Sequence, residues 1–123
     1  MERIIAQNPD VIVIVDEAYI DFGGTSALPL IDKYDNVLVV QTFSKSHSMA
    51  GMRIGYAMAQ PELIKYLNDV KYSFNSYTLN SLTIEMGTAA ILPAASYHPF
   101  HLFCSYSSRR MVRAAKAGRR FNA

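Results

Sequence analysis

The chain has 123 residues, 50% of them hydrophobic and 18% charged, which is the composition of an ordinary soluble globular domain. Its longest aliphatic run, Val11 to Val15, is too short to span a membrane, and the N-terminus lacks the pattern of a signal peptide. The single cysteine, Cys104, excludes an internal disulfide framework and fits a reducing compartment, so we expect a cytoplasmic protein.

The formal charge of +2 conceals two regions of opposite sign. Residues 1–85 contain all ten acidic residues and six basic ones, whereas residues 86–123 contain six basic residues and no acidic one. Such a change is typical of a boundary or a solvated tail, and less often of a nucleic-acid surface. No nucleic-acid module surrounds the basic run, so we expect neither nucleic acid nor a membrane as a partner. The pattern divides the chain into residues 1–92 and a basic tail, residues 93–123.

The N-terminal half predicts a helix followed by two strands. Residues 2–8 indicate the end of a helix, which the sequence Asn-Pro-Asp at 8–10 stops. The continuous, β-branched run at 11–15 and the run at 36–42 predict strands buried on both faces. A short helical turn is expected over residues 27–34. The spacing of the two strands, near 25 residues, fits a parallel sheet with crossovers, and therefore an α/β fold with a mainly parallel sheet and flanking helices.

The following segment predicts one more strand and two helices. Residues 53–59 alternate and indicate a third strand. Pro61 opens a helix that runs to about Lys71. Its expected inward positions are Leu63, Leu67 and Val70. Thr78 or Asn80 could cap a further helix to about Leu92. The basic tail shows no clear periodicity, and we expect no defined order there.

Polar side chains follow the first two strands where each strand ends. Asp16 and Tyr19 follow the first, and the second is followed by Thr42, Ser44, Lys45 and Arg53. In α/β proteins, ligands bind outside the carboxyl ends of parallel strands. A carboxylate, a phenol, a lysine and an arginine together are the parts of a pyridoxal-phosphate site, which needs a Schiff-base lysine and a partner for the pyridinium nitrogen.

Each of these residues also has a simpler interpretation. Asp16 could be a turn cap, or with Glu17 the end of a Walker B strand in an ATPase fragment, although no G-x-x-x-x-G-K-[ST] sequence is present. A lone lysine is usually a solvated charge. Around Lys45, however, hydroxyls suit a phosphate, and Arg53 can grip one bidentately or form a surface ion pair. His47 has no companion at metal-ligand spacing, so no metal site is expected.

Two sequences, VDEAYIDF at 15–22 and TFSKSHSMAGMRIGY at 42–56, resemble the fold-type-I pyridoxal-phosphate aminotransferases of class I/II. The resemblance covers about residues 1–91 and implies the central part of that family's large domain. It implies that Lys45 is the Schiff-base lysine and Asp16 the pyridinium partner. Tyr19 would donate to the ring's phenolic oxygen and Ala18 would pack on the ring. The implied phosphate ligands are Thr42, Ser44 and Arg53.

Within the family, DEAYIDF is most similar to the enzymes that act on histidinol phosphate. This implies transamination between an amino-acid-like phosphate, histidinol phosphate, and 2-oxoglutarate in histidine biosynthesis, by a homodimer. The family's upstream phosphate loop and its C-terminal small domain are expected to lie outside this chain, so the fragment is expected to be incomplete for catalysis. From about Leu92 the sequence ceases to resemble the family, and a replaced, truncated or out-of-frame tail is our hypothesis. A non-catalytic fragment whose tail mediates contacts stays open.

Overall fold

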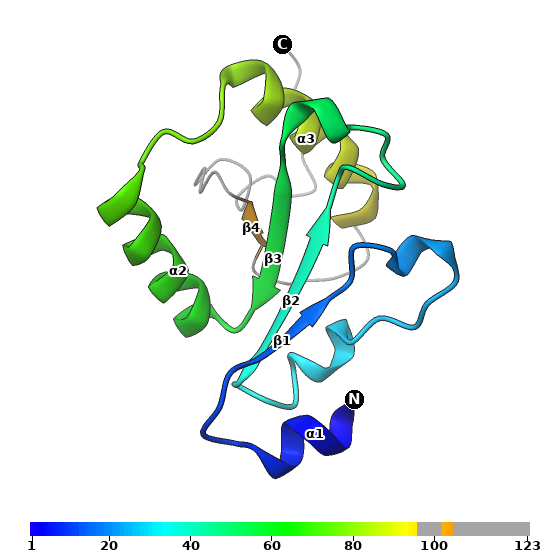
Figure 1. Cartoon of the computed structure of the whole chain (residues 1–123), viewed down its shortest axis with the longest axis vertical. Helices are drawn as coiled ribbons and strands as arrows, with labels where there is room; N and C mark the ends of the chain where they lie inside the picture. The colour runs from blue at the N-terminus through cyan, green and yellow to red at the C-terminus, as the bar shows by residue number, and fades with distance from the viewer. Residues whose placement is uncertain (96–101, 105–123) are drawn as a thin grey trace.

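A computed structural model describes residues 1–95 and 102–104 of the chain, and Figure 1 shows their arrangement. The helices are α1 (Glu2–Gln7), α2 (Pro61–Phe74) and α3 (Ser81–Ala95). The strands are β1 (Val13–Asp16), β2 (Val37–Thr42), β3 (Gly55–Ala59) and β4 (Leu102–Cys104). Short 3-10 turns form η1 (Ile20–Phe22), η2 (Leu28–Leu30) and η3 (Ala50–Met52). The predicted α/β class with flanking helices is confirmed.

The described strands form one sheet in the order β1-β2-β3-β4, which is mixed rather than mainly parallel. Strands β1 and β2 are parallel, whereas β2 with β3 and β3 with β4 are antiparallel. The reason lies in the connections. Residues 17–36 cross over between β1 and β2 through η1 and η2, but residues 43–54 contain only the short turn η3. The first connection is long enough to cross over the sheet, whereas the shorter second one turns back on itself, with the Phe43 amide donating to the Ile54 carbonyl at 3.3 Å, so β3 runs back alongside β2.

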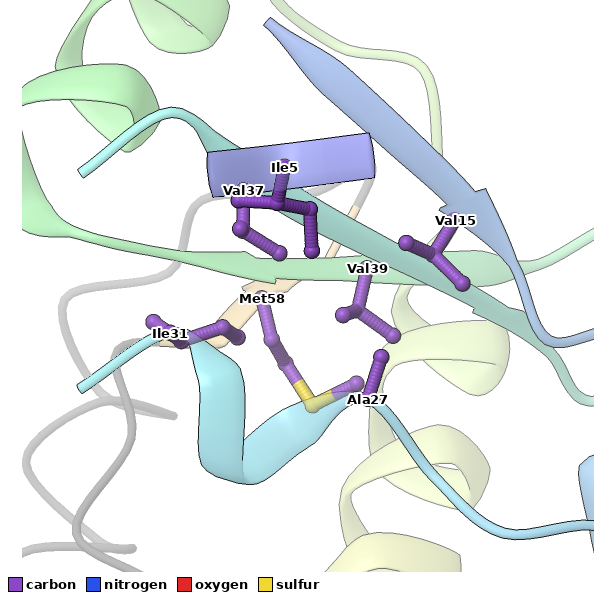
Figure 2. Close-up of a cluster of buried hydrophobic side chains, with 7 residues drawn as sticks. All are labelled: Ile5, Val15, Ala27, Ile31, Val37, Val39 and Met58. Carbon is purple, nitrogen blue, oxygen red and sulfur yellow. The ribbon is translucent and has the colours of Figure 1, made fainter. Parts of the chain in front are cut away.

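One face of the sheet carries the larger apolar cluster, shown in Figure 2. Its buried members are Ile5, Val15, Ala27, Ile31, Val37, Val39 and Met58. Helix α1 contributes Ile5, and the segment around η2 contributes Ala27 and Ile31, so the predicted helix at 2–8 and the helical turn at 27–34 are confirmed as the cover of this face.

Helix α2 covers the opposite face, where Leu63, Ile64 and Leu67 pack against a buried group formed by Leu38, Ala57 and Ala59. The predicted inward position of Val70 is wrong, because this side chain is 68% exposed. The packed side chains of α2 end at Leu67, and Val70 lies beyond them. Within the described part of the chain, no helix is both long and apolar enough to cross a membrane.

Burial on both faces holds for β2 but not for β1. Val37, Leu38 and Val39 are all buried, whereas Ile14 is 62% exposed. Ile14 pairs with Leu38 and so lies on the face that α2 covers, but the side chains of α2 pack only on β2 and β3. The β1 strand is thus an edge strand with one uncovered face in the described chain.

Helix α3 supports the connection between β2 and β3, which we call the Lys45 loop (residues 43–54). Asn80 caps the helix, since its side-chain oxygen accepts a 2.8 Å hydrogen bond from the Thr83 amide. The buried cluster of Phe43, Ile54 and Ile91 joins helix and loop. Helix α3 runs to Ala95, past the expected end at Leu92. In the basic tail, residues 102–104 form β4, which pairs with β3, so the expectation of no defined order is wrong for these residues; most of the tail lies outside the described residues.

Candidate functional site

A cavity of about 490 Å³ opens at the carboxyl ends of β1 and β2. Its lining residues are Asp16, Ala18, Val40, Gln41, Thr42, Ser44, Lys45, Ala50 and Arg53. The parallel register, in which Asp16 is the partner of Val40, brings the two strand ends to one edge. All the candidate site residues singled out from the sequence therefore line one cavity, except Tyr19.

Tyr19 lies next to this cavity rather than in its wall. The Lys45 Nζ atom is 5.0 Å from the centroid of the Tyr19 ring, within the range of a cation–π contact. Tyr19 also lines a neighbouring cavity, together with Asp16 and Ala18. The phenol is thus adjacent to the lysine across the gap between the first strand end and the Lys45 loop.

Asp16 is the last residue of β1 and is exposed. Its Oδ1 atom accepts a 3.0 Å hydrogen bond from the Ala18 amide, which is the turn-capping contact that the simpler interpretation predicts. A carboxylate has acceptor sites for about four hydrogen bonds, so this single contact orients the group without exhausting it. The capping role and a ligand-binding role are therefore compatible.

The Lys45 loop is held by its own hydrogen bonds. The Ser44 amide donates to Thr42 Oγ1 at 3.1 Å, the Ser48 amide to the Lys45 carbonyl at 3.0 Å, and the Met49 amide to the Phe43 carbonyl at 2.9 Å. Phe43 is fully buried beneath the loop. Lys45 itself is exposed at the cavity. The hydrogen-bonded backbone thus presents an exposed amine to the cavity.

Arg53 closes the loop in an unusual conformation, with φ +53° and ψ +46°. For a residue with a Cβ atom this left-handed conformation costs roughly 1–2 kcal/mol. The guanidinium donates to the Ala50 carbonyl at 2.8 Å and lines the cavity. The alternative of a surface ion pair is not what the structure shows, since the salt bridge found among the described residues joins Lys33 and Glu2.

The sequence interpretation considered Glu17 only with Asp16, as the end of a Walker B strand, and did not predict its burial: the residue is only 6% exposed. Its carboxylate accepts hydrogen bonds from the Ala27 amide at 2.6 Å, from Ser26 Oγ at 2.9 and 3.1 Å, and from Gln41 Nε2 at 2.8 Å. Strand alternation was the available signal, because neighbouring residues of a strand face opposite sides. Asp16 and Glu17 therefore do not present two carboxylates to one ligand, which argues against the ATPase interpretation.

His47 is half-buried rather than simply solvated. Its ring packs edge-on against Phe43 at 5.0 Å between centroids, and its Nδ1 lies 3.1 Å from Ser46 Oγ. Ser46 Oγ also donates to Asp21 Oδ2, which connects the segment after β1 to the Lys45 loop.

The comparisons with known proteins agree with this arrangement. The family described as aminotransferase class I and II matches residues 1–118, and the chain belongs to this family. Because the match continues past Leu92, the expectation that the resemblance ends there is wrong. The histidinol-phosphate aminotransferase of Aromatoleum aromaticum is 57% identical over 91 residues, which are 74% of this chain and 26% of the relative. That of Lactococcus lactis subsp. cremoris is 57% identical over 90 residues, 73% of this chain and 25% of the relative. That of Brachyspira hyodysenteriae is 59% identical over 92 residues, 74% of this chain and 26% of the relative.

The chain thus spans about a quarter of the length of these curated relatives. Within that quarter lie the two strand ends, the cavity and the Lys45 loop.

Proposed function

We propose that this chain supplies the cofactor-binding part of a pyridoxal-phosphate-dependent aminotransferase that exchanges an amino group between histidinol phosphate and 2-oxoglutarate. The observation that carries the proposal is the single cavity lined by Lys45, Asp16, Arg53 and two hydroxyl side chains. The relatives that are 57–59% identical to this chain are histidinol-phosphate aminotransferases, which supports the choice of substrate. We further propose, as the family membership implies, a cytoplasmic homodimer in histidine biosynthesis, with residues 1–92 as the cofactor-binding part and residues 93–123, most of which the family match also covers, as a tail distinguished by its basic composition.

The residues of the cavity fit the chemical groups of pyridoxal phosphate. Thr42, Ser44 and Arg53 offer two hydroxyls and a guanidinium to an anionic phosphate. Asp16, at the other strand end, offers a carboxylate to a protonated ring nitrogen, and Ala18 offers a small apolar surface to the ring face. Tyr19, beside Lys45, offers a phenol donor to the ring oxygen. When bound, the cofactor supplies an electron sink for the bond cleavage at the substrate's α-carbon.

Lys45 has two successive tasks in this proposal. Its amine would hold the cofactor covalently and would be released when the substrate binds. The released Lys45 amine would take the proton from the substrate's α-carbon as a general base and then, as a general acid, deliver it to the cofactor's C4′ carbon rather than back to the α-carbon, as amino-group transfer requires. Exposure of Lys45 on a hydrogen-bonded loop supports both tasks, since the amine must move while its backbone stays in place.

The first prediction is that borohydride fixes the cofactor to Lys45. We expect peptide mapping of the reduced, pyridoxal-phosphate-treated chain to find the pyridoxyl group on Lys45. The variant K45A should lose the label, and K65A, which removes an exposed lysine of α2, should keep it. A label on Lys33, Lys65 or Lys71 would overturn the assignment.

The second prediction is that this chain by itself self-associates and turns over no histidinol phosphate. Strand β1 is an edge strand whose Ile14 and neighbouring Val11 and Ile12 are exposed, and such edges favour pairing with other chains. Analytical ultracentrifugation should detect species larger than the monomer. Measurable transamination by the isolated chain would contradict the expectation that the catalytic parts are incomplete.

A further inference from the structure

A polar row crosses three strands on the face of the sheet that carries the larger apolar cluster. The Tyr56 hydroxyl donates to Gln41 Oε1, and Gln41 Nε2 donates to the Glu17 carboxylate at 2.8 Å. Gln41 and Tyr56 are direct partners in the β2–β3 register. The Glu17 amide donates to the Val40 carbonyl at 2.9 Å, which continues the β1–β2 pairing by one residue. The three side chains thus connect the carboxyl end of β1 to β2 and β3.

The row begins behind the candidate site at Glu17 and reaches the cavity wall at Gln41. Asp16 and Ala18, the neighbours of Glu17, line the cavity, and so do Gln41 itself and its neighbour Thr42. Alternation along a strand turns the Glu17 side chain away when its neighbours face the ligand. A shift of either strand end would therefore move the Asp16 carboxylate and the Thr42 hydroxyl relative to each other.

The carboxylate of Glu17 is buried and satisfied entirely by donors that hold parts of this region together. Ser26 Oγ and the Ala27 amide fix the far end of the segment that carries Tyr19, and Gln41 fixes the strand that leads into the Lys45 loop. A buried acceptor left without its donors is costly, so the geometry of this row is strongly specified. The aliphatic neighbours Val15 and Val39 offer no such directional contact.

We propose that Glu17 is a positioning residue: through Gln41 it fixes Asp16 and Ala18 relative to Thr42 and the Lys45 loop. This proposal rests on the proposed function of the cavity. It assigns Glu17 no contact with substrate or cofactor, and it makes the orientation of the Gln41 amide part of the site's geometry.

The test exchanges the two side chains. The variant Q41E places two carboxylates against each other, whereas E17Q/Q41E restores the link between the two side chains. The new amide at 17 can donate to the new carboxylate at 41, which also accepts from Tyr56, and the remaining oxygen at 17 can still accept from the Ala27 amide and Ser26 Oγ. We expect Q41E to accelerate amide hydrogen exchange at Ala18 and to weaken pyridoxal-phosphate binding about tenfold, with a changed absorption spectrum of the bound cofactor. The double variant should return all three readouts towards those of the unmodified chain. E17Q alone should have a mild effect, because the Gln41 amide can rotate.

The matched control is S26A, which removes a donor to the same carboxylate but leaves the link to β2 in place. It should lower the thermal midpoint without changing the cofactor spectrum. If Q41E does not fold, Q41L, which removes the donor without adding a charge, should show the same changes on a smaller scale.

Two outcomes would overturn the proposal: a double variant no better than Q41E, or a Q41E variant that matches the unmodified chain in all three readouts. If the unmodified chain takes up no pyridoxal phosphate, the proposed function fails instead, and amide exchange at Ala18 alone then decides whether the link holds the strand ends.

Discussion

Replacing Asp16 with asparagine is expected to lower kcat/KM for transamination at least about 100-fold, or about 3 kcal/mol of transition-state stabilisation, while cofactor binding changes little. Asparagine keeps the oxygen that accepts from the Ala18 amide, so the turn after β1 should persist. It loses the negative charge that would stabilise a protonated ring nitrogen. Thr42, Ser44 and Arg53 would still hold the phosphate in the proposed arrangement. D16N therefore separates the charge of Asp16 from its local structural contact.

The measurement needs an enzyme with every part of the site. A suitable one is a hybrid in which residues 1–91 replace the corresponding quarter of the Lactococcus lactis relative, to which they are 57% identical. The control is D32N in the same hybrid, since Asp32 is exposed and lies outside the cavity. Unchanged turnover in D16N would mean that Asp16 serves only as a turn cap.

Truncating Phe43 to alanine should cost about 3–5 kcal/mol of unfolding free energy, the largest loss of stability we expect from a single side chain. Phe43 is fully buried, and its ring lies 5.1 Å from that of Tyr56 and 5.0 Å from that of His47. It also packs in the cluster with Ile54 and Ile91, which anchors α3 beneath the Lys45 loop. Deleting the ring would leave a cavity at the place where strand, loop and helix meet.

Urea unfolding followed by circular dichroism would measure the loss. The matched control is F74A, because Phe74 is 92% exposed at the end of α2 and its truncation should change stability by no more than about 0.5 kcal/mol. Equal midpoints for F43A and F74A would show that the cluster beneath the loop contributes little to stability.

The sequence predicted which polar residues come together better than it predicted the direction of strand β3. Polar residues that follow a buried strand are a strong signal, because strand ends meet at one edge, and this placed Asp16, Thr42 and Lys45 in one cavity. The antiparallel direction of β3 was not predicted, because the alternation at 53–59 indicates a strand without indicating which way it runs. Only the shortness of the preceding connection carries that information.

Exposure and side-chain pairing were harder to predict. The apolar character of Ile14 and Val70 suggests burial, but burial depends on which tertiary neighbour covers each face. Helix α2 packs on β2 and β3 and leaves Ile14 uncovered, and Val70 lies beyond the α2 residues that pack on the sheet. The structural role of Glu17 was not predicted, because a glutamate beside a candidate aspartate suggests a second ligand-binding acid. Its role depends on Ser26, Ala27 and Gln41, partners from other parts of the chain whose proximity only the fold establishes.

The Lys45 loop has a consequence for how such a site can be inherited. One uninterrupted stretch of sequence contains Thr42, Ser44, Lys45 and Arg53, because β3 returns directly beside β2. A genetic crossover outside residues 42–53 therefore transmits the amine, the guanidinium and the hydroxyls as one unit. Asp16, Ala18 and Tyr19 form a second unit, which a crossover within residues 20–41 separates from the first. The residues of the candidate site thus lie in two short sequence segments that recombination can exchange independently. In the folded chain the pairing of β1 with β2 joins these segments.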